Sequence, residues 1–247
     1  MRIRRRWLLL LIPIIVALAF VLWGAFPVAP LPEALAALES DSAVIVGRDR
    51  WITFTPVGVE PQAGLVFYPG GRIDPRAYAL PAREIASAGY LVVIAPMPLN
   101  FAVLDPNRAA SVMAAHPEVA RWAVGGHSLG GAMAAQFARR RPDAVDGLVL
   151  WAAYPSPTDD LSQSDLAVVS IYGTRDRAAA SVEGSRHLLP QDTVYVAIQG
   201  GDHAQFGDYG PPGDSAAASI TRAQQQADAV SATLELLAGL AGAAAGG

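Results

Sequence analysis

The heptapeptide at residues 125–131 reads Gly-Gly-His-Ser-Leu-Gly-Gly. Inside it lies a G-x-S-x-G pattern, in which His127 and Ser128 stand between Gly126 and Gly130. A serine at a sharp strand-to-helix turn needs small neighbours, because a β-carbon two positions away would collide with the backbone. The pattern alone is weak in a chain with 23 glycines. An apolar run before it and an alanine-rich stretch after it favour a nucleophile elbow.

Apolar runs and alanine-rich stretches alternate along most of the chain around this motif. Strands are predicted at residues 43–46, 51–55, 64–68, 90–95, 121–125, 147–152, 166–172 and 193–198. Helices are predicted at residues 76–88, 105–115, 129–140, 181–188 and 220–240. This alternation is typical of an α/β fold, with a mostly parallel central sheet and helices on both faces. The first two strands suggest an antiparallel pair that opens the sheet.

A serine at the elbow requires catalytic partners, because its hydroxyl is a poor nucleophile at neutral pH. A base must take the proton, and an acid must hold that base in the useful tautomer. In this architecture the partners follow in the order Ser, Asp or Glu, His, each after a later strand. Asp176 follows the strand at 166–172, and His203 follows the strand at 193–198. We therefore predict Ser128 as nucleophile, Asp176 as orienting acid and His203 as general base.

Alternatives to both partners remain open at this point. Asp176 could merely form a turn or pair with a neighbouring arginine. Asp202 and Asp208 are the alternative acids, although both lie too close to His203 in sequence for the expected order. The other histidines do not follow a terminal strand; they are His116, His127 and His187.

Backbone amides are predicted to stabilise the oxyanion of a tetrahedral intermediate. One amide belongs to Leu129, directly after the nucleophile and at the start of a helix whose dipole favours negative charge. The second is expected in the loop Pro-Gly-Gly-Arg at 69–72, where Gly71 is the first choice and Arg72 the reserve. A plain tight turn would explain the two glycines equally well, and the two roles are compatible.

The segments at 68–75, 125–131, 172–176 and 200–209 together resemble the α/β-hydrolase superfamily, in particular its small, capless, dienelactone-hydrolase-like members. The resemblance covers residues 41 to about 240 and implies a Ser-Asp-His triad and an acyl-enzyme mechanism. Pro69 stands where many relatives carry histidine, which changes the detail of the oxyanion loop. Dienelactone hydrolases proper use a cysteine nucleophile, so their substrate is not carried over.

The N-terminus combines four arginines at positions 2, 4, 5 and 6 with an uncharged, apolar run at 7–26. As a helix this run would be about 30 Å long and would match the hydrocarbon core of a bilayer. The positive-inside rule then places the rest of the chain outside the cytoplasm. We predict an uncleaved single-pass anchor; a cleaved secretory peptide, which would release the protein, is the alternative.

The predicted organisation is therefore a single folded domain on a membrane anchor. The divisions are a basic stub at 1–6, the anchor at 7–26, a linker at 27–40, the α/β domain at 41–241 and a frayed tail at 242–247. The chain has 18 basic and 22 acidic residues, and four of the basic residues precede the anchor. The rest of the chain therefore carries an excess of negative charge, so no nucleic-acid partner is expected. The absence of cysteine excludes disulfides and thiolate ligands, and neither a metal nor a cofactor is predicted.

The segment between the strands at 147–152 and 166–172 is short, so it leaves little room for a lid. The site should be shallow and open, suited to a small acyl ester or to an acyl group carried by a lipid or an envelope polymer. Its predicted walls are Asn100, Phe101, Tyr154 and Phe206. Ester, thioester or amide hydrolysis is expected; acyl transfer with the same residues, or a non-catalytic binding scaffold, are the alternatives.

Overall fold

The computed structural model describes residues 5–210 and 218–245. Within them, eight strands form one sheet in the order β1-β2-β4-β3-β5-β6-β7-β8. β1 pairs with β2 and β2 with β4 antiparallel, and the other pairs are parallel, which confirms the predicted fold class. The strands are β1 (Val44–Gly47), β2 (Ile52–Pro56), β3 (Gly64–Tyr68), β4 (Leu91–Ile94), β5 (Trp122–His127), β6 (Gly147–Trp151), β7 (Ala167–Gly173) and β8 (Val194–Ile198).

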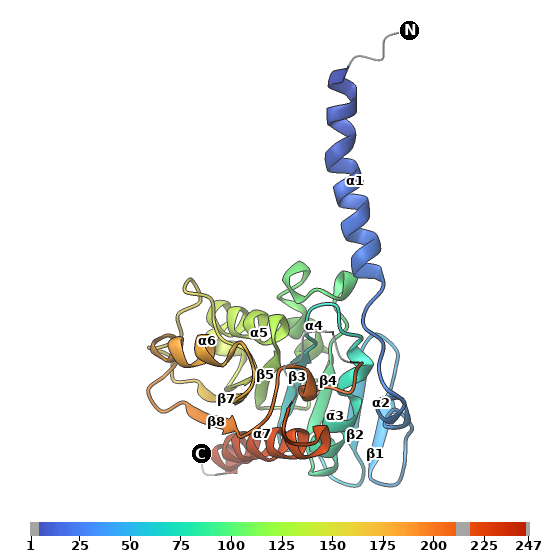
Figure 1. Ribbon diagram of the computed structural model, residues 1–247. Coiled ribbons are helices and arrows are strands. Elements are labelled where there is room, and N and C mark those ends of the chain that lie inside the picture. The colour runs from blue at the N-terminus through green and yellow to red at the C-terminus, as the bar shows by residue number, and fades with distance from the viewer. Residues whose placement is uncertain (1–4, 211–217, 246–247) are drawn as a thin grey trace.

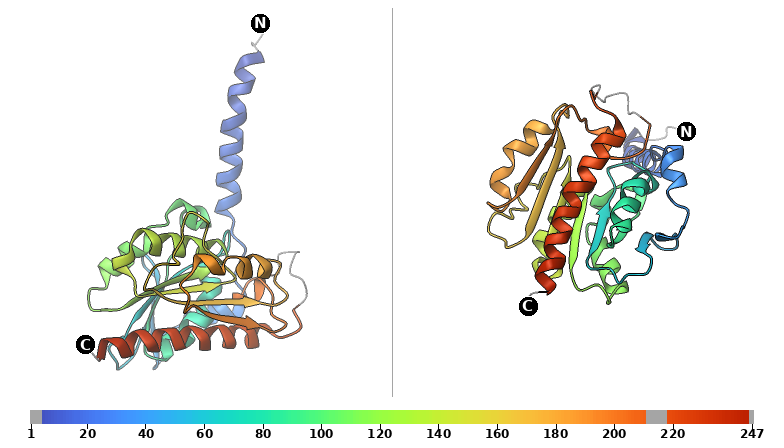
Figure 2. Two further views of the ribbon diagram at one scale, coloured as in Figure 1. Left: turned by 90° about the vertical axis from the view of Figure 1, so that its left-hand side faces the viewer. Right: turned by 90° about the horizontal axis from the view of Figure 1, so that it is seen from below.

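Helices cover both faces of the sheet (Figure 1, Figure 2). The α-helices are α1 (Arg5–Ala25), α2 (Pro32–Ala36), α3 (Ala79–Ser87), α4 (Arg108–Ala115), α5 (Leu129–Arg140), α6 (Ala179–Gly184) and α7 (Arg222–Ala245). Short 3₁₀ turns lie at Pro75–Tyr78, Pro98–Asn100, Ala102–Leu104, Pro142–Ala144, Arg186–Leu188 and Ala204–Phe206. Buried residues of α3 and α7 share one core cluster, and those of α4 and α5 share the other, so the two pairs lie on opposite faces.

In β3, alternate side chains belong to the two different core clusters. All five of its residues are buried, as expected for a central parallel strand covered on both faces. Its side chains alternate, so Leu65 and Phe67 enter the cluster of α3 and α7, whereas Val66 and Tyr68 enter the cluster of α4 and α5. Full burial of such a side chain contributes about 1.5–3 kcal/mol, which fixes the strand's register.

The parallel register brings the carboxyl ends of the strands to one edge, which we call the catalytic edge. Tyr68 of β3 pairs with Gly126 of β5, and Gly173 of β7 pairs with Ile198 of β8. The loops after these four strands therefore start at the same level of the sheet. This is the edge at which open α/β sheets bind their ligands.

Several predicted helix boundaries differ from the structure. The helices predicted at 76–88, 181–188 and 220–240 are observed at Ala79–Ser87, Ala179–Gly184 and Arg222–Ala245. The helix expected to start at residue 105 begins at Arg108, because residues 102–104 form a 3₁₀ turn and the Asp105 carboxylate pairs with Arg108 Nε at 3.0 Å instead of capping the helix. The tail expected to be frayed is helical through Ala245 as the end of α7. Residues 246–247 of that tail lie outside the described residues.

The predicted anchor forms helix α1, which projects from the body of the molecule (Figure 1). No helix in the described part of the chain proves long and apolar enough to cross a membrane. The side chains of residues 7–11 of the predicted anchor lie outside that part. The membrane-spanning segment therefore stays a prediction.

Residues 27–40, the predicted linker, pack against the domain. Val28 forms a parallel bridge with Ile73, and Pro30 forms an antiparallel bridge with Tyr209. The short helix α2 then buries Ala34 completely. Proline at the start of α2 suits its first turn, where the missing N–H has no helical partner. These contacts attach the segment after α1 to two loops of the catalytic edge.

Candidate active site

Ser128 occupies the turn between β5 and α5 in a strained conformation. Its backbone has φ 52° and ψ −122°, a region that non-glycine residues adopt only where the surrounding structure imposes it. The Ser128 N–H donates to the Trp151 carbonyl at 2.9 Å, which ties the turn to β6. A β-carbon on Gly126 or Gly130 would collide with the Tyr68 carbonyl. The glycine requirement predicted from the motif thus has a structural cause, and the half-buried serine lies at the catalytic edge.

Asp176 and His203 form a hydrogen-bonded pair at the same edge. His203 Nδ1 lies 2.7 Å from Asp176 Oδ2, and Asp176 Oδ1 accepts from the Ala178 N–H at 2.7 Å. The aspartate side chain is 2 % exposed, whereas the histidine side chain is 38 % exposed. A carboxylate can only accept, so Nδ1 carries the proton and Nε2 is left as the basic nitrogen. This is the arrangement that orients an imidazole as a general base.

The histidine of this pair lies beside the elbow. The rings of His203 and His127 have centroids 4.7 Å apart, and His127 Nε2 is 3.0 Å from the His203 carbonyl. In the described residues we find no hydrogen bond between Ser128 Oγ and the His203 ring. Such bonds are often long in a free enzyme and shorten when substrate arrives. The fold thus brings the three predicted residues to one edge, and the step that joins nucleophile to base stays a prediction.

Gly71 and Leu129, whose amides are the predicted oxyanion donors, lie side by side. A β-carbon on Gly71 would lie 3.2 Å from Leu129 Cδ2, so the two residues adjoin. The neighbours of Gly71 have their amides engaged: Gly70 N–H donates to Tyr78 Oη at 3.0 Å, and Arg72 N–H donates to the Asn100 carbonyl at 2.8 Å. The hydrogen bond of the Arg72 amide argues against the reserve choice, and Gly71 stays the predicted second donor.

A hydrogen-bond chain that the sequence did not predict joins three segments: the loop at 69–72, which we call the oxyanion loop, the elbow, and the loop that carries His203. It runs from the Gly70 N–H to Tyr78 Oη, from Tyr78 O–H to His127 Nδ1 at 2.9 Å, and from His127 Nε2–H to the His203 carbonyl. The terminal carbonyl can only accept, which fixes every donor in the chain. No local signal marks Tyr78, since its partner lies 49 positions away.

Burial keeps this chain uncharged. Desolvation, followed by the proximity of His203, holds the pKa of His127 well below its ordinary 6.5. Desolvation also raises the pKa of Tyr78 well above 10. His127 and Tyr78 therefore retain their donor and acceptor roles across the physiological pH range.

The depressed pKa of His127 predicts a pH-dependent stability. Below about pH 6.5 the unfolded chain binds a proton at His127 that the folded chain does not, so the free energy of unfolding falls as pH falls, by up to about 1.4 kcal/mol per pH unit. Urea unfolding between pH 7.5 and 5 measures this slope. His127→Gln should reduce the slope, and His187→Gln, at an exposed histidine, should not. An unchanged slope in His127→Gln would contradict the assignment.

Removing the central hydroxyl of the chain tests its role directly. We expect Tyr78→Phe to lower the free energy of unfolding by about 2 kcal/mol, because it leaves the Gly70 N–H and His127 Nδ1 buried without a partner. The loss should appear in urea unfolding, together with a roughly tenfold lower kcat for a p-nitrophenyl ester. Tyr90→Phe, in the same core cluster, is the matched control and should change neither quantity by as much. Equal effects of the two substitutions would refute the role of the hydroxyl.

The four predicted pocket walls have different surroundings. Phe206 is buried, and its ring stacks on the ring of His127 with centroids 5.7 Å apart, so it packs against the elbow and lines no open pocket. Phe101 is also buried, and its ring contacts α1. Asn100 donates from its side chain to the Gly24 carbonyl at 2.9 Å. Tyr154 is exposed and remains the one wall residue of this set with a free surface.

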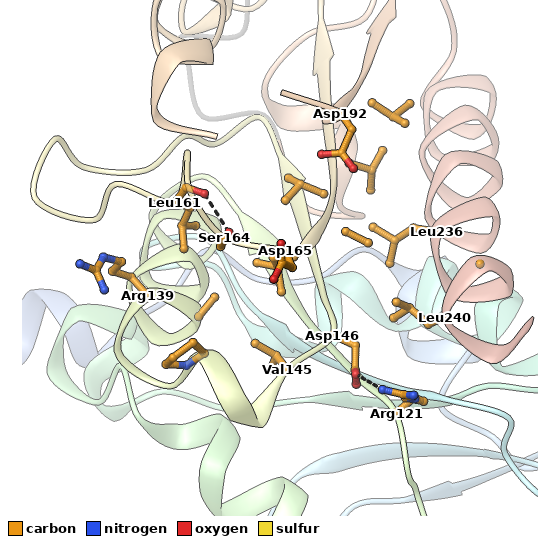
Figure 3. A pocket seen from close by; sticks show the side chains of 18 of the residues that line it. Arg121, Arg139, Val145, Asp146, Leu161, Ser164, Asp165, Asp192, Leu236 and Leu240 are labelled. Carbon is orange, nitrogen blue, oxygen red and sulfur yellow. Dashed lines mark hydrogen bonds and ion pairs between the residues drawn. The ribbon is translucent and has the colours of Figure 1, made fainter. Parts of the chain in front are cut away.

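The large pocket of about 920 Å³ shown in Figure 3 does not contain the triad. It lies at the opposite edge of the sheet, near the amino ends of β6, β7 and β8. Leu236 and Leu240 of α7 line one side, and Arg121 forms an ion pair with Asp146 at 2.6 Å on another (Figure 3). Its size therefore says nothing about the space beside Ser128.

The α/β-hydrolase class of fold is defined by the features described above. They are the order of the strands, the elbow after β5, the acid after β7 and the histidine after β8. The model of the alpha/beta hydrolase family matches residues 64–227, which is more than half of the chain. The chain belongs to the α/β hydrolase family. No curated protein matches it in sequence. The narrower resemblance to dienelactone hydrolases stays a prediction.

Solved structures share the fold at low sequence identity. A bacterial heroin esterase is 17% identical with a TM-score of 0.60, covering 83% of this chain and 88% of its own. The esterase domain of a Rhodothermus marinus protein is 16% identical with a TM-score of 0.57, covering 77% and 91%. A predicted CIB-like hydrolase from Thermoplasma acidophilum is 15% identical with a TM-score of 0.57, covering 81% and 100%. At such identities the likeness concerns the fold alone.

Proposed function

We propose that this protein is a serine hydrolase that cleaves carboxylic ester, thioester or amide bonds through an acyl-enzyme on Ser128. Membership of the α/β hydrolase family supports hydrolysis, and two of the similar structures are described as esterases. The observation that carries the serine mechanism is the 2.7 Å hydrogen bond between His203 Nδ1 and the buried Asp176 carboxylate beside the elbow.

In the acylation step, Ser128 Oγ attacks the carbonyl carbon while its proton passes to His203 Nε2. The carbonyl oxygen becomes an oxyanion, for which Leu129, at the start of α5, and Gly71, in the loop after β3, supply amide donors. His203 then returns the proton to the leaving alcohol, thiol or amine as its bond to the acyl carbon breaks. Asp176 stays ionised and stabilises the imidazolium that forms.

In the deacylation step, His203 Nε2 takes a proton from water as the water oxygen attacks the acyl carbon. Collapse of the second oxyanion breaks the bond to Ser128 Oγ, which recovers the proton, and releases the carboxylic acid. An alcohol acceptor in place of water would give acyl transfer with the same residues. Within the described residues, the segment 152–166 between β6 and β7 holds no helix that could form a lid over these steps. An open site of this kind fits small acyl groups, or an acyl group presented by a lipid or envelope polymer.

Turnover of p-nitrophenyl esters by the purified full chain tests the proposal. We expect steady release of p-nitrophenol, preceded by a burst when deacylation is slower than acylation, since the acyl-enzyme then accumulates. Adding a small alcohol to the assay separates the two fates of the acyl group: ester product marks acyl transfer, and free acid marks hydrolysis. A chain that releases no p-nitrophenol and binds no acyl group would favour the alternative of a non-catalytic scaffold.

We also propose that α1 anchors the protein in a membrane, with the domain outside the cytoplasm. The four arginines at positions 2–6, which precede the apolar run, and the exposure of apolar side chains between residues 12 and 22 support this. An anchored domain would meet lipid-linked acyl groups at the bilayer surface. The protein should stay with membranes after an alkaline carbonate wash and should be cleaved by protease added outside the cell. Release into the wash would contradict the anchor.

A further inference from the structure

The last turn of α1 makes specific contacts with a loop of the catalytic edge. We call residues 20–26 the helix foot. The ring of Phe101 stacks on Phe20 with centroids 5.3 Å apart and lies 5.4 Å from the ring of Trp23. Asn100 binds the Gly24 carbonyl, and a β-carbon on Gly24 would lie 2.9 Å from the Leu99 carbonyl. The close fit at Gly24 shows that the helix foot and the loop at 98–101 are packed together at backbone level.

Arg72, in the oxyanion loop, binds the helix foot through its guanidinium group. Its guanidinium donates from Nε to the Trp23 carbonyl at 3.1 Å and from Nη2 to the Phe26 carbonyl at 3.0 Å. The same group lies over the Trp23 ring, 4.2 Å from the centroid. A cation that binds the last carbonyls of a helix satisfies groups without a helical partner and interacts favourably with the helix dipole. Arg72 thus binds the end of α1 as a C-terminal cap.

The backbone of Arg72 is held by the same set of neighbours. Its N–H donates to the Asn100 carbonyl, and its own carbonyl accepts from the Val28 N–H at 2.7 Å. Arg72 has φ 59°, and Leu99 and Asn100 have φ 49° and 58°. Such conformations are strained for residues that carry a β-carbon, and they persist only where the surroundings impose them. The helix foot and the segment after it provide those surroundings.

Gly71 lies directly between these contacts and the nucleophile. A β-carbon on it would lie 3.7 Å from the Phe101 ring and 3.2 Å from Leu129 Cδ2. The Gly71 N–H shares its peptide plane with the Gly70 carbonyl, which accepts from the Ile73 N–H at 3.1 Å, so its direction is set by the turn at 70–73. Arg72 lies inside this turn, and α1 holds Arg72 in place. Oxyanion donors must be placed within a few tenths of an ångström to be effective.

We propose that the helix foot is a positioning element of the oxyanion loop, acting through Arg72 and Trp23, so that the N-terminal helix completes the catalytic centre as well as attaching the domain. Arg72 is a positioning residue, since its side chain binds α1 and not the reacting atoms. This inference rests on the proposed serine hydrolase mechanism for its catalytic consequence. The positioning itself can be measured without activity.

The experiment compares Trp23→Ala, Trp23→Phe and Arg72→Ala in the full chain. The controls are wild type and Arg50→Ala, which removes another arginine stacked on a tryptophan, at the outer edge of the sheet. We measure kcat for p-nitrophenyl acetate per site labelled by a fluorophosphonate probe, KM, and hydrogen exchange of the amide at residue 72 relative to its intrinsic rate in each variant. Trp23→Ala and Arg72→Ala should lower kcat per labelled site about tenfold with KM within about twofold. They should also speed exchange at least tenfold, and Trp23→Phe should restore part of both.

The outcomes separate the inference from the proposed function. Faster exchange together with lower kcat per labelled site supports positioning, because a merely structural loss would lower the number of labelled sites instead. Unchanged exchange overturns the inference, and faster exchange with unchanged kcat overturns its catalytic part. A wild type that neither labels nor turns over ester refutes the proposed function, and the exchange rates then decide the positioning alone.

Discussion

Ser128→Ala is expected to lower kcat for p-nitrophenyl acetate by about 10⁴-fold or more, to the level left by binding and oxyanion donors alone. The substitution removes the oxygen that would carry the acyl group and leaves the elbow intact, because alanine is no larger than serine. Steady-state kinetics on the purified full chain, normalised to the concentration of folded protein, measure the loss. KM should change little, since the hydroxyl contributes to the transition state more than to binding.

The control for this substitution is Ser87→Ala, at an exposed serine whose hydroxyl donates to the Arg83 carbonyl on α3. It should leave kcat within about twofold of wild type. Urea unfolding of both variants should give cooperative transitions, which shows that Ser128→Ala is folded. A folded Ser128→Ala that retains more than about a tenth of the wild-type kcat would mean that another residue carries the chemistry.

Asp176→Asn is expected to lower kcat by about 10³- to 10⁴-fold. An amide can donate to His203 Nδ1, which favours the tautomer that carries its proton on Nε2, and that nitrogen can then no longer accept from Ser128. The buried position of Asp176 makes the exchange nearly isosteric and preserves the Ala178 N–H contact to the remaining oxygen. Kinetics with p-nitrophenyl acetate should show the loss in kcat at every pH between 6 and 9.

The alternative acids provide a matched comparison. Asp202 is equally buried, but its Oδ1 accepts from the Gln205 N–H, and Asp208 Oδ1 accepts from Gln226. Asp202→Asn and Asp208→Asn should therefore lower kcat by less than about tenfold. A loss in either variant as large as that in Asp176→Asn would contradict the assignment of Asp176 as the acid.

The strands and the elbow were predictable because their signals are local. β3 and α5 have the bounds expected from the sequence, since an apolar run and a G-x-S-x-G turn mark their ends without help from distant residues. The chain order then led to Asp176 and His203, which the structure joins by a hydrogen bond. Burial on both faces and the fixed hand of parallel crossovers leave few other places for these side chains.

The supporting residues of the site were not predictable, because their partners are remote in sequence. Tyr78 reaches His127 across 49 positions, and Arg72 reaches Trp23 across another 49. Neither contact has a periodicity or a motif that marks it. The same limit applies to the amide of Arg72: only the position of Asn100 reveals that its N–H is engaged.

The rate of fluorophosphonate labelling, with the adduct mapped by peptide mass spectrometry, tests the central claim most directly. A phosphonate forms a covalent bond only with a serine whose proton has a base to go to. We expect one adduct, on Ser128, that forms in wild type and forms at least about 10³-fold more slowly in His203→Ala and Asp176→Asn. An adduct on another residue, or labelling of Ser128 at an unchanged rate in His203→Ala, would contradict the claim that these three residues act as one catalytic unit.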